Sequence, residues 1–377
     1  MDERTWVVID LDKFKRNVRA LKGVTPGVKI LAAVKADAYG HGARETARTL
    51  KEEGIDMLGV ASIDEACDLK AIDLPIVILS PTSINNIPKL LAEDFIPTLS
   101  YYPFAEELNK SAKMVNKKVK VHIEIDTGLG RTGIPWEEGV DFVLQVLELK
   151  NLKLDGIFTH FSEPEKIDSD FTSRQINRFK SVIHGLTKKG IRIPLIHTAS
   201  TAAILNFPDS YFNMIRPGLI LYGLYPSDRC IRRVQVEPIL SLYTKVCQLK
   251  WVPPGTPISY DRTYVTKKSQ RIATLWVGYG DGYPRCLSSK GSVIIRGRRA
   301  KVVGKVCMDL TMVDVTHIPE IEVGDKVTLI GKDGSLEITA DEVAKLAGTI
   351  NYEITTGISP RVTRVYVNNG RLSRANL

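Results

Sequence analysis

Lys35 is the residue whose type and position most directly indicate chemistry. It ends the apolar run Lys29–Lys35 and opens the turn Ala36–Ala43, which contains Gly40 and Gly42. Most lysines are solvated surface charges, and this one is open to the same interpretation. At the carboxyl end of a buried strand, however, desolvation lowers the pKa of a lysine amine. The free amine is a nucleophile that forms a Schiff base with an aldehyde.

Further polar groups favour an aldehyde that also carries a phosphate. Tyr39 lies in the same turn, four residues after the lysine. The segment Arg216–Leu219 follows a late apolar run, and Ser200 and Thr201 follow the run before it. Backbone amides next to Gly218, with hydroxyls nearby, are groups that bind phosphate. The lysine alone would fit an aldolase, but the combination favours a phosphorylated aldehyde cofactor.

Strand-like and helical segments alternate through the first part of the chain. The predicted strands are Lys29–Val34, Met57–Ala61, Pro75–Leu79, Phe95–Leu99, Val119–Ile125, Leu154–Thr159, Ile193–His197 and Asn213–Ile215. Amphipathic helical segments such as Ile63–Ile72 and Ser173–Lys189 lie between them. Eight such units in about 220 residues predict an α/β fold, a closed (β/α)8 TIM-type barrel rather than an open sheet.

Polar residues recur where these predicted strands end. They are Lys35, Ser62, Ser80, Asp126, His160, His197 and Arg216. Barrel enzymes build their active sites from the carboxyl ends of the strands, whereas a barrel that served only stability would need few polar residues there. The pattern therefore indicates an enzyme.

A second domain is predicted from the change of pattern near Val236. Short alternating apolar segments divided by Gly and Pro turns follow, with one helical stretch, Thr339–Leu346, that begins with a capping box. We therefore expect a barrel over residues 1–235 and a mostly β domain over residues 236–377. The strand-like segment Thr5–Ile9 fits either domain, so residues 1–10 are open to joining the second.

Composition excludes several classes of protein. The 377 residues carry a net charge of +9, but the basic residues are dispersed, which does not favour nucleic-acid binding. No apolar run is long enough for a membrane span, and the start lacks the features of a signal peptide. The five cysteines contain no C-x-x-C pair, which argues against a disulfide framework and a zinc site. We expect a cytoplasmic protein without a metal site.

Eight motifs resemble bacterial alanine racemase. In chain order they are AVKADAYGHG, DTGLGRTG, THF, HTAST, RPGLILYG, VGYGDGYPR, VCMD and INYE. The resemblance extends from about Trp6 to Arg364. It implies a homodimer that depends on pyridoxal 5'-phosphate (PLP) and has an N-terminal barrel and a C-terminal β domain. The implied reaction interconverts L-alanine and D-alanine, which supplies D-alanine for peptidoglycan of the cell wall.

The resemblance also implies roles for single residues. Lys35 would bind PLP as a Schiff base and serve as one base, and Tyr279 would be the opposite base, reaching the site of the partner subunit. Arg216 would face the pyridine nitrogen and, as a permanent donor, leave it unprotonated. His197 and His160 would extend this network toward Tyr279.

Other implied contacts concern the phosphate and the substrate carboxylate. The residues matching the family's phosphate contacts are Tyr39, Ser200, Thr201, Gly218, Leu219 and Tyr352. Arg131 and the backbone of Met308 match the groups near the substrate carboxylate. Ser200 stands where the family has an asparagine, which places its role in question.

Glu124 marks a second departure from the family. A carbamylated lysine is common at this position and pairs with the arginine that corresponds to Arg131. Our hypothesis is that Glu124 supplies the negative charge directly. The alternative is that it is an ordinary, partly exposed strand residue.

Four alternatives stay open at this point. Serine is a possible substrate, because small pockets reject a hydroxyl analogue poorly. A PLP-dependent amino acid decarboxylase shares a related design but would need an acidic partner for the pyridine nitrogen, where Arg216 stands. A single-barrel PLP-binding homeostasis protein would lack the second domain. A nucleic-acid-binding protein would depend on net charge alone.

Overall fold

The computed structural model describes residues 4–374. The chain divides into two compact units, one of residues 15–237 and the other of residues 4–14 together with 238–374. Residues 4–14 thus lie with the second unit, an arrangement that the sequence analysis left open for residues 1–10, and the first unit ends at residue 237. Among the described residues, none of the helices combines the length and apolar character needed to cross a bilayer.

The first unit contains the predicted barrel. Its strands, as far as residues 4–374 show, are β2 (Lys29–Ala33), β3 (Met57–Val60), β4 (Ile76–Ile78), β5 (Ile96–Leu99), β6 (Val119–Asp126), β8 (Leu152–Phe158), β9 (Leu195–Ser200) and β10 (Met214–Arg216). They pair in parallel in the order β5-β4-β3-β2-β10-β9-β8-β6, and β5 also pairs with β6, which closes the barrel. The short strand β7 (Ile134–Pro135) pairs with β6.

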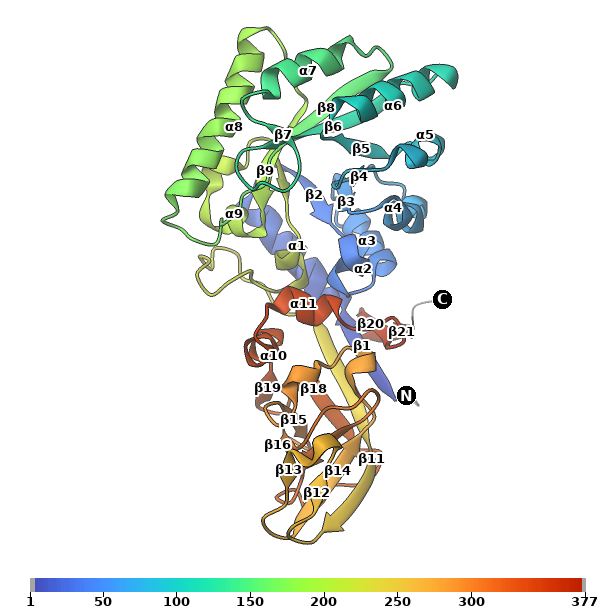
Figure 1. Cartoon of the computed structure of the whole chain (residues 1–377), viewed down its shortest axis with the longest axis vertical. Coiled ribbons are helices and arrows are strands. Elements are labelled where there is room, and N and C mark those ends of the chain that lie inside the picture. The colour runs from blue at the N-terminus through green and yellow to red at the C-terminus, as the bar shows by residue number, and fades with distance from the viewer. Residues whose placement is uncertain (1–3, 375–377) are drawn as a thin grey trace. The chain divides into compact units, whose positions relative to one another are not determined.

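Helices alternate with these strands and lie around them (Figure 1). They are α1 (Leu11–Val24), α2 (Lys35–Tyr39), α3 (Ala43–Glu52), α4 (Ile63–Leu69), α5 (Ile87–Glu93), α6 (Tyr102–Met114), α7 (Gly139–Glu148), α8 (Asp170–Lys188) and α9 (Thr201–Asn206), with 3-10 turns η1 (Lys70–Ile72), η2 (Ile84–Asn86), η3 (Pro208–Ser210) and η4 (Leu219–Tyr222). The alternation read from the sequence is confirmed.

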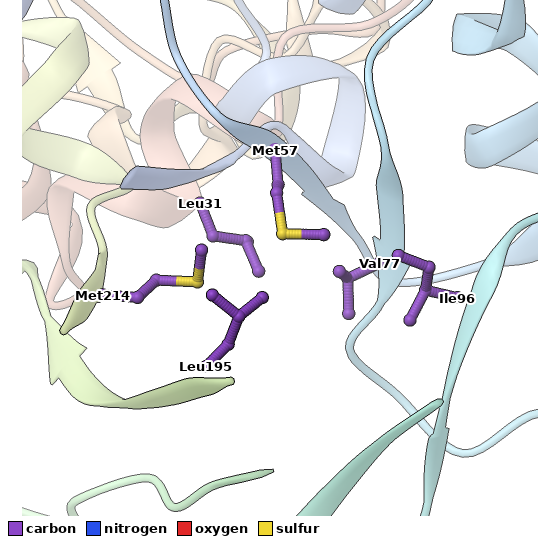
Figure 2. Packing of buried hydrophobic residues seen from close by; sticks show 6 residues of the cluster. All are labelled: Leu31, Met57, Val77, Ile96, Leu195 and Met214. Atoms are coloured by element: carbon purple, nitrogen blue, oxygen red, sulfur yellow. The ribbon is translucent and has the colours of Figure 1, made fainter. Parts of the chain in front are cut away.

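Apolar side chains fill the amino-terminal half of the barrel. The buried cluster consists of Leu31, Met57, Val77, Ile96, Leu195 and Met214, and Figure 2 shows these side chains converging from separate strands. Met57, Ile96, Leu195 and Met214 are the first residues of their strands. Apolar packing at this end of the barrel therefore stabilises the fold, and the polar residues lie at the opposite, carboxyl ends of the strands.

Strand β9 differs from the prediction in a way that matters for the site. It continues to Ser200, so His197 lies inside the strand rather than at its end. Met214 pairs with His197, but Arg216 pairs with Ser200, which shows an irregular register between β9 and β10. Such an irregularity re-aims neighbouring side chains and is frequent next to active sites.

The second unit is mostly β, as predicted. Its strands are β1 (Thr5–Asp10), β11 (Leu240–Val252), β12 (Pro257–Ile258), β13 (Tyr264–Val265), β14 (Gln270–Leu275), β15 (Ser292–Ile295), β16 (Arg298–Val302), β17 (Thr311–Asp314), β18 (Lys326–Asp333), β19 (Leu336–Ile338), β20 (Thr363–Asn368) and β21 (Arg371–Arg374). Its helices are α10 (Ala340–Ala347) and α11 (Asn351–Thr356), and its 3-10 turns are η5 (Tyr260–Arg262), η6 (Tyr279–Asp281) and η7 (Arg285–Leu287).

Strand β1 belongs to this unit because of its pairing. Val7 pairs with Leu242 of β11 in antiparallel fashion and with Arg364 of β20 in parallel fashion. Both edges of β1 are therefore engaged by strands of the second unit. Helix α10 begins where the capping box predicted, since the Thr339 hydroxyl accepts a hydrogen bond from the Glu342 N–H.

The barrel core gives a first testable prediction. We expect Leu31→Ala to lower the free energy of unfolding by about 2–5 kcal/mol, because a fully buried side chain leaves a cavity. Lys29→Ala, at the exposed start of the same strand, should change it by less than about 0.5 kcal/mol. Urea denaturation measures both. Equal losses for the two variants would contradict the assignment of this layer to the core.

Candidate active site

Lys35 lies two residues after the end of β2, at the carboxyl end of the barrel. Desolvation lowers the pKa of its amine, and the positive charge of Arg131 lowers it further; Glu65 acts in the opposite direction, and Arg216 lowers it again. The environment therefore favours the free, nucleophilic amine, as the sequence predicted.

The backbone after Lys35 is strained. Ala36, Asp37, Ala38 and Tyr39 all have left-handed conformations, with φ between 52° and 55°. Each such residue that is not glycine costs about 1–2 kcal/mol, and a run of four is unusual. Strain of this kind persists only where the surrounding structure holds it, and it is concentrated at functional sites.

Arg216 ends β10 and is 5% exposed. Its Nη1 donates to the His197 carbonyl at 2.7 Å, and its Nη2 donates to the carbonyls of Thr159 at 2.7 Å and Thr198 at 3.1 Å. Burial lowers the pKa of Arg216 to about 10, which leaves the guanidinium protonated at neutral pH. Within residues 4–374, the Nε–H donates to no protein acceptor, so this donor is left for a ligand.

The guanidinium also fixes the protons of two histidines. Arg216 Nη1 lies 2.9 Å from His197 Nδ1 and can only donate, so Nδ1 accepts and the His197 proton is on Nε2. That nitrogen lies 3.0 Å from His122 Nδ1, which must accept in turn. Desolvation, together with the charge of Arg216, lowers the pKa of both rings, that of His122 to about 3. Both rings are therefore neutral.

His160 has a similar relation to the arginine. Its Nδ1 lies 3.2 Å from Arg216 Nη2 and accepts from it. Desolvation and then the charge of Arg216 lower the pKa of this ring well below its usual value. The structure therefore brings together Arg216, His197 and His160, as the sequence predicted.

His122 was missed by the sequence analysis. It lies on β6 two residues before Glu124, so the two side chains share one face of the strand. It pairs with Gly156, where a Cβ would lie 2.7 Å from the imidazole ring. A histidine opposite a glycine on the neighbouring predicted strand was the available signal, because only glycine leaves room for the ring.

A second group of donors lies after β9 and β10. The Thr201 hydroxyl accepts from the Gly218 N–H at 3.1 Å, and a Cβ at Gly218 would lie 2.5 Å from the Tyr39 hydroxyl. Burial raises the pKa of Tyr39 to about 12, so its phenol remains a donor. Leu219 is the first residue of η4, so its N–H has no acceptor within that helix.

Ser200 is the N-cap residue of α9, but its side chain makes no capping hydrogen bond. The four residues Tyr39, Thr201, Gly218 and Leu219 thus converge as predicted, and Ser200 lies next to them in sequence. Their hydroxyls and backbone amides are the donors that a phosphate group requires.

Arg131 lies in the loop after β6. The Asp126 carboxylate shapes this loop by accepting hydrogen bonds from the backbone amides of Gly128 at 2.8 Å and Leu129 at 2.9 Å. The Arg131 side chain is exposed. Within the part of the chain that the structure describes, Lys35, Arg131 and Arg216 form no ion pair with a carboxylate. The two guanidinium groups, Arg131 and Arg216, are therefore uncompensated cations, which favour anionic ligands.

Glu124 is buried, with 3% of its surface exposed, so it is not an ordinary partly exposed strand residue. Burial raises the pKa of its carboxyl group, while a hydrogen bond with Thr132 and the charge of Arg131 oppose this rise. In residues 4–374, its Oε2 has no hydrogen-bond partner and no ion pair within 4.0 Å joins it to Arg131. The influence of Glu124 on Arg131 is thus electrostatic rather than a direct contact.

The second unit carries the remaining predicted residues. The Tyr279 N–H donates to the Cys307 carbonyl at 3.0 Å, so Tyr279 lies beside Met308. A Cβ at Gly278 would lie 2.3 Å from the carbonyl oxygens of Cys307 and Met308, so only glycine permits this approach. The side chains of Tyr279 and Met308 are 42% and 55% exposed. Tyr352 lies on α11.

Comparison with known proteins identifies the family. Residues 9–226 match the family described as alanine racemase, N-terminal domain, and residues 239–366 match alanine racemase, C-terminal domain. The chain is 45% identical over 367 residues to an alanine racemase from Halothermothrix orenii, covering 97% of each chain. It belongs to the alanine racemase family.

Solved structures agree with this assignment. An alanine racemase of Clostridium difficile 630 has a TM-score of 0.95 at 37% identity, covering 99% of this chain and 98% of its own. One from Bartonella henselae, with covalently bound pyridoxal phosphate, has a TM-score of 0.88 at 27% identity, covering 97% of this chain and 100% of its own. Alanine racemases are PLP-dependent isomerases that interconvert L-alanine and D-alanine.

The donor set of the alanine racemase barrel fits PLP. A desolvated amine at Lys35, an uncommitted Nε–H at Arg216 and the donors around Gly218 correspond to the aldehyde, the pyridine nitrogen and the phosphate. The decarboxylase alternative is not favoured, because a cation rather than a carboxylate lies at the strand end. The single-barrel alternative is not favoured either, since the second unit matches the family's C-terminal domain.

The buried imidazole of His122 predicts a pH effect on stability. Its folded pKa of about 3 lies below the ordinary value of 6.5, so the unfolded chain binds a proton that the folded chain does not. Stability is then full above pH 6.5 and falls as the pH is lowered toward 3. At pH 5 we expect this residue to have removed about 2 kcal/mol.

Urea denaturation at a series of pH values measures the effect. In His122→Gln, the fall in the free energy of unfolding between pH 8 and pH 5 should become smaller by that amount. His184→Gln is the control, because the exposed His184 side chain is hydrated in both states. Identical pH dependence in wild type and His122→Gln would exclude a neutral, buried imidazole at this position.

Proposed function

We propose that this chain interconverts L-alanine and D-alanine with two bases on opposite faces of the substrate. Lys35 is one base, and the other is Tyr279 of the partner subunit. PLP bound at Lys35 supplies an electron-withdrawing group that acidifies the α C–H bond of the substrate. One base removes the α-proton, and the other returns a proton from the opposite side, which inverts the carbon.

Arg216 restricts the chemistry to proton exchange. Both of its terminal nitrogens are committed to protein acceptors, so Nε–H is the donor that would meet the pyridine nitrogen. A guanidinium does not give up its proton at neutral pH, so it would leave that nitrogen unprotonated and limit electron withdrawal. His197 and His160 support the guanidinium, because they accept hydrogen bonds from the two terminal nitrogens.

The anionic groups of cofactor and substrate would bind at two places. Tyr39, Ser200, Thr201, Gly218, Leu219 and Tyr352 would hold the phosphate. Arg131 and the backbone of the partner subunit's Met308 would hold the substrate carboxylate, with Glu124 acting on Arg131 through its charge. The positive charges of Arg131 and Arg216, which form no ion pair with a carboxylate in the described residues, support this assignment.

A homodimer is supported by an exposed apolar surface on the second unit. Trp276, Tyr279, Met308 and Leu310 are 43%, 42%, 55% and 41% exposed. Leu275 pairs with Thr311, which places Trp276 and Leu310 on facing strand ends. An apolar group of this kind marks an interaction surface. We propose that a second copy covers it, which would also bring the phenol to the partner's site.

The observation that carries this proposal is the desolvated Lys35 amine, which follows the strand that pairs with the strand of Arg216, together with the one donor of Arg216 that is free within the described residues. We propose alanine rather than serine as the substrate because the family is named for alanine. Comparable kcat/KM values for the two would overturn that choice. A cytoplasmic enzyme that supplies D-alanine for cell-wall peptidoglycan fits the proposed reaction.

Complementation tests the reaction and the shared site together. Lys35→Ala and Tyr279→Phe should each lower racemisation of L-alanine by at least about a hundredfold, because each removes one base. Coexpressed, they should recover about one quarter of wild-type turnover, since half of the dimers are mixed and each mixed dimer has one intact site. Chiral chromatography measures turnover.

Two controls accompany this experiment. Tyr243→Phe makes the same chemical change elsewhere in the second unit and should not lower turnover. Lys35→Ala should also remove the visible absorbance that borohydride abolishes in wild type. Absence of recovery in mixed dimers of confirmed composition would show that both bases come from one chain.

Glu124 gives a separate prediction. Glu124→Gln preserves shape but removes the charge, so Arg131 should orient the substrate carboxylate less well. We expect kcat/KM for alanine to fall about tenfold, mainly through KM, which corresponds to the loss of one interaction with a charged group. Steady-state kinetics measures this, with the exposed Glu106→Gln as the control. Unchanged affinity and turnover would remove Glu124 from the site.

A further inference from the structure

Glu65 lies in the first turn of α4, after β3, and has a visible structural role there. Its Oε2 accepts hydrogen bonds from the backbone N–H groups of Ala61 at 2.7 Å and Ser62 at 3.3 Å. The Ser62 hydroxyl accepts in return from the Glu65 N–H at 3.2 Å. This reciprocal pair is a capping box, which satisfies the free amides at the start of a helix.

The other carboxylate oxygen does something that the helix cap does not require. Glu65 Oε1 accepts a hydrogen bond of 2.7 Å from the Ala36 N–H, 29 positions earlier in the chain. Ala36 follows Lys35 directly, so this bond ties the loop after β2 to the loop after β3. One carboxylate therefore holds amides from two neighbouring strand ends.

The bond acts on the peptide that orients Lys35. The Ala36 nitrogen belongs to the planar peptide unit that starts at the Lys35 carbonyl, so a hydrogen bond to it restrains the rotation about the Lys35 Cα–C bond. Ala36 is also the first of the four left-handed residues. A strained turn needs an external hold, and a charge-assisted hydrogen bond at its first amide supplies one.

Glu65 also contributes charge. Among the groups that act on the Lys35 amine, Arg131 and Arg216 favour its neutral form, and Glu65 is the one that favours its protonated form. The carboxylate thus limits how far the surrounding cations shift the amine.

We propose that Glu65 is a positioning residue for Lys35. Its hydrogen bond with the Ala36 amide orients Lys35, and its negative charge opposes the effect of the nearby cations on the amine. This inference rests on the proposed function, because it concerns the amine that binds PLP. The competing explanation is that Glu65 serves only as a helix cap. Ser62 separates the two, since it takes part in the cap but not in the bond to Ala36.

Three variants separate the effects of the helix cap, the hydrogen bond to Ala36 and the negative charge of Glu65. Ser62→Ala removes half of the capping box and keeps the bond to Ala36. Glu65→Asp keeps the charge, but a side chain one methylene shorter does not reach both loops. Glu65→Gln loses the charge and replaces one accepting oxygen with an amide donor.

Hydrogen exchange at the Ala36 amide in the holoenzyme tests the contact directly. We expect exchange to become about tenfold faster in Glu65→Gln and in Glu65→Asp, the change that corresponds to one charge-assisted hydrogen bond. The rate in Ser62→Ala should equal that of wild type. Release of PLP, followed by absorbance, should become faster in the same two variants. Equal behaviour of Ser62→Ala and the Glu65 variants would overturn the inference.

The pH dependence of PLP binding to the apoenzyme tests the charge. Loss of the carboxylate lowers the pKa of Lys35, so the free amine exists at lower pH and the rise in binding rate should move to lower pH in Glu65→Gln. It should not move in Glu65→Asp or Ser62→Ala. A rise at the same pH in all variants would contradict the charge role. If wild type binds no PLP, the proposed function fails, while exchange at Ala36 still decides the contact.

Discussion

A guanidinium that keeps its proton is buried at the carboxyl end of the barrel, and the groups around Arg216 are arranged to accept hydrogen bonds from it. Carbonyl oxygens of Thr159, His197 and Thr198 accept from its terminal nitrogens. A buried charge without such partners would cost several kcal/mol. Burial lowers the pKa values of the three nearby histidines, and the charge of Arg216 lowers them further; the same charge adds to the lowering of the Lys35 pKa by burial and by Arg131. Burial and the charge of Arg216 thus act in the same direction on these groups.

Among the described residues, carboxylates near the site accept hydrogen bonds from backbone amides rather than forming ion pairs with Lys35, Arg131 or Arg216. Asp126 accepts from amides of the loop that leads to Arg131, and Glu65 accepts from Ala36 and the start of α4. Glu124 is buried without an ion pair to Arg131 in the described residues. Acidic side chains are therefore used to shape loops, while the positive charges at the barrel mouth remain uncompensated. This division suits a site for a phosphate and a carboxylate.

Much of the fold and of the site was predictable, for physical reasons. Apolar runs that alternate with amphipathic segments predicted the barrel, and strand ends predicted where Lys35 and Arg216 would lie. His122 was missed because a lone histidine in an apolar strand has no motif, and its role depends on Gly156 of the neighbouring strand. The hydrogen bond from the Ala36 N–H to Glu65 was missed because a capping box already accounts for the spacing of Ser62 and Glu65.

Other features depend on tertiary structure and leave little trace in sequence. The left-handed run from Ala36 contains three residues with no local preference for that conformation, so only the surrounding structure explains it. The irregular register that extends β9 to Ser200 arises from pairing with β10. The place of β1 was open because a short apolar run pairs equally well in either domain. Its partners β11 and β20 lie more than 200 residues away in sequence.

The separation of the two central groups of the barrel is set by strand register. Lys35 follows β2 and Arg216 ends β10, and these strands pair directly through Met214 with Lys29 and Ile215 with Ile30. The Ala33 N–H continues this ladder to the Pro217 carbonyl at 2.9 Å. Strand pairing therefore fixes the backbones that carry the amine and the guanidinium, as positioning on rigid elements requires. Strand pairing does not set the direction of the amine itself, because Lys35 lies beyond the strand in a strained turn. In that turn, the hydrogen bond from the Ala36 N–H to the side chain of Glu65 provides the hold that strand pairing cannot.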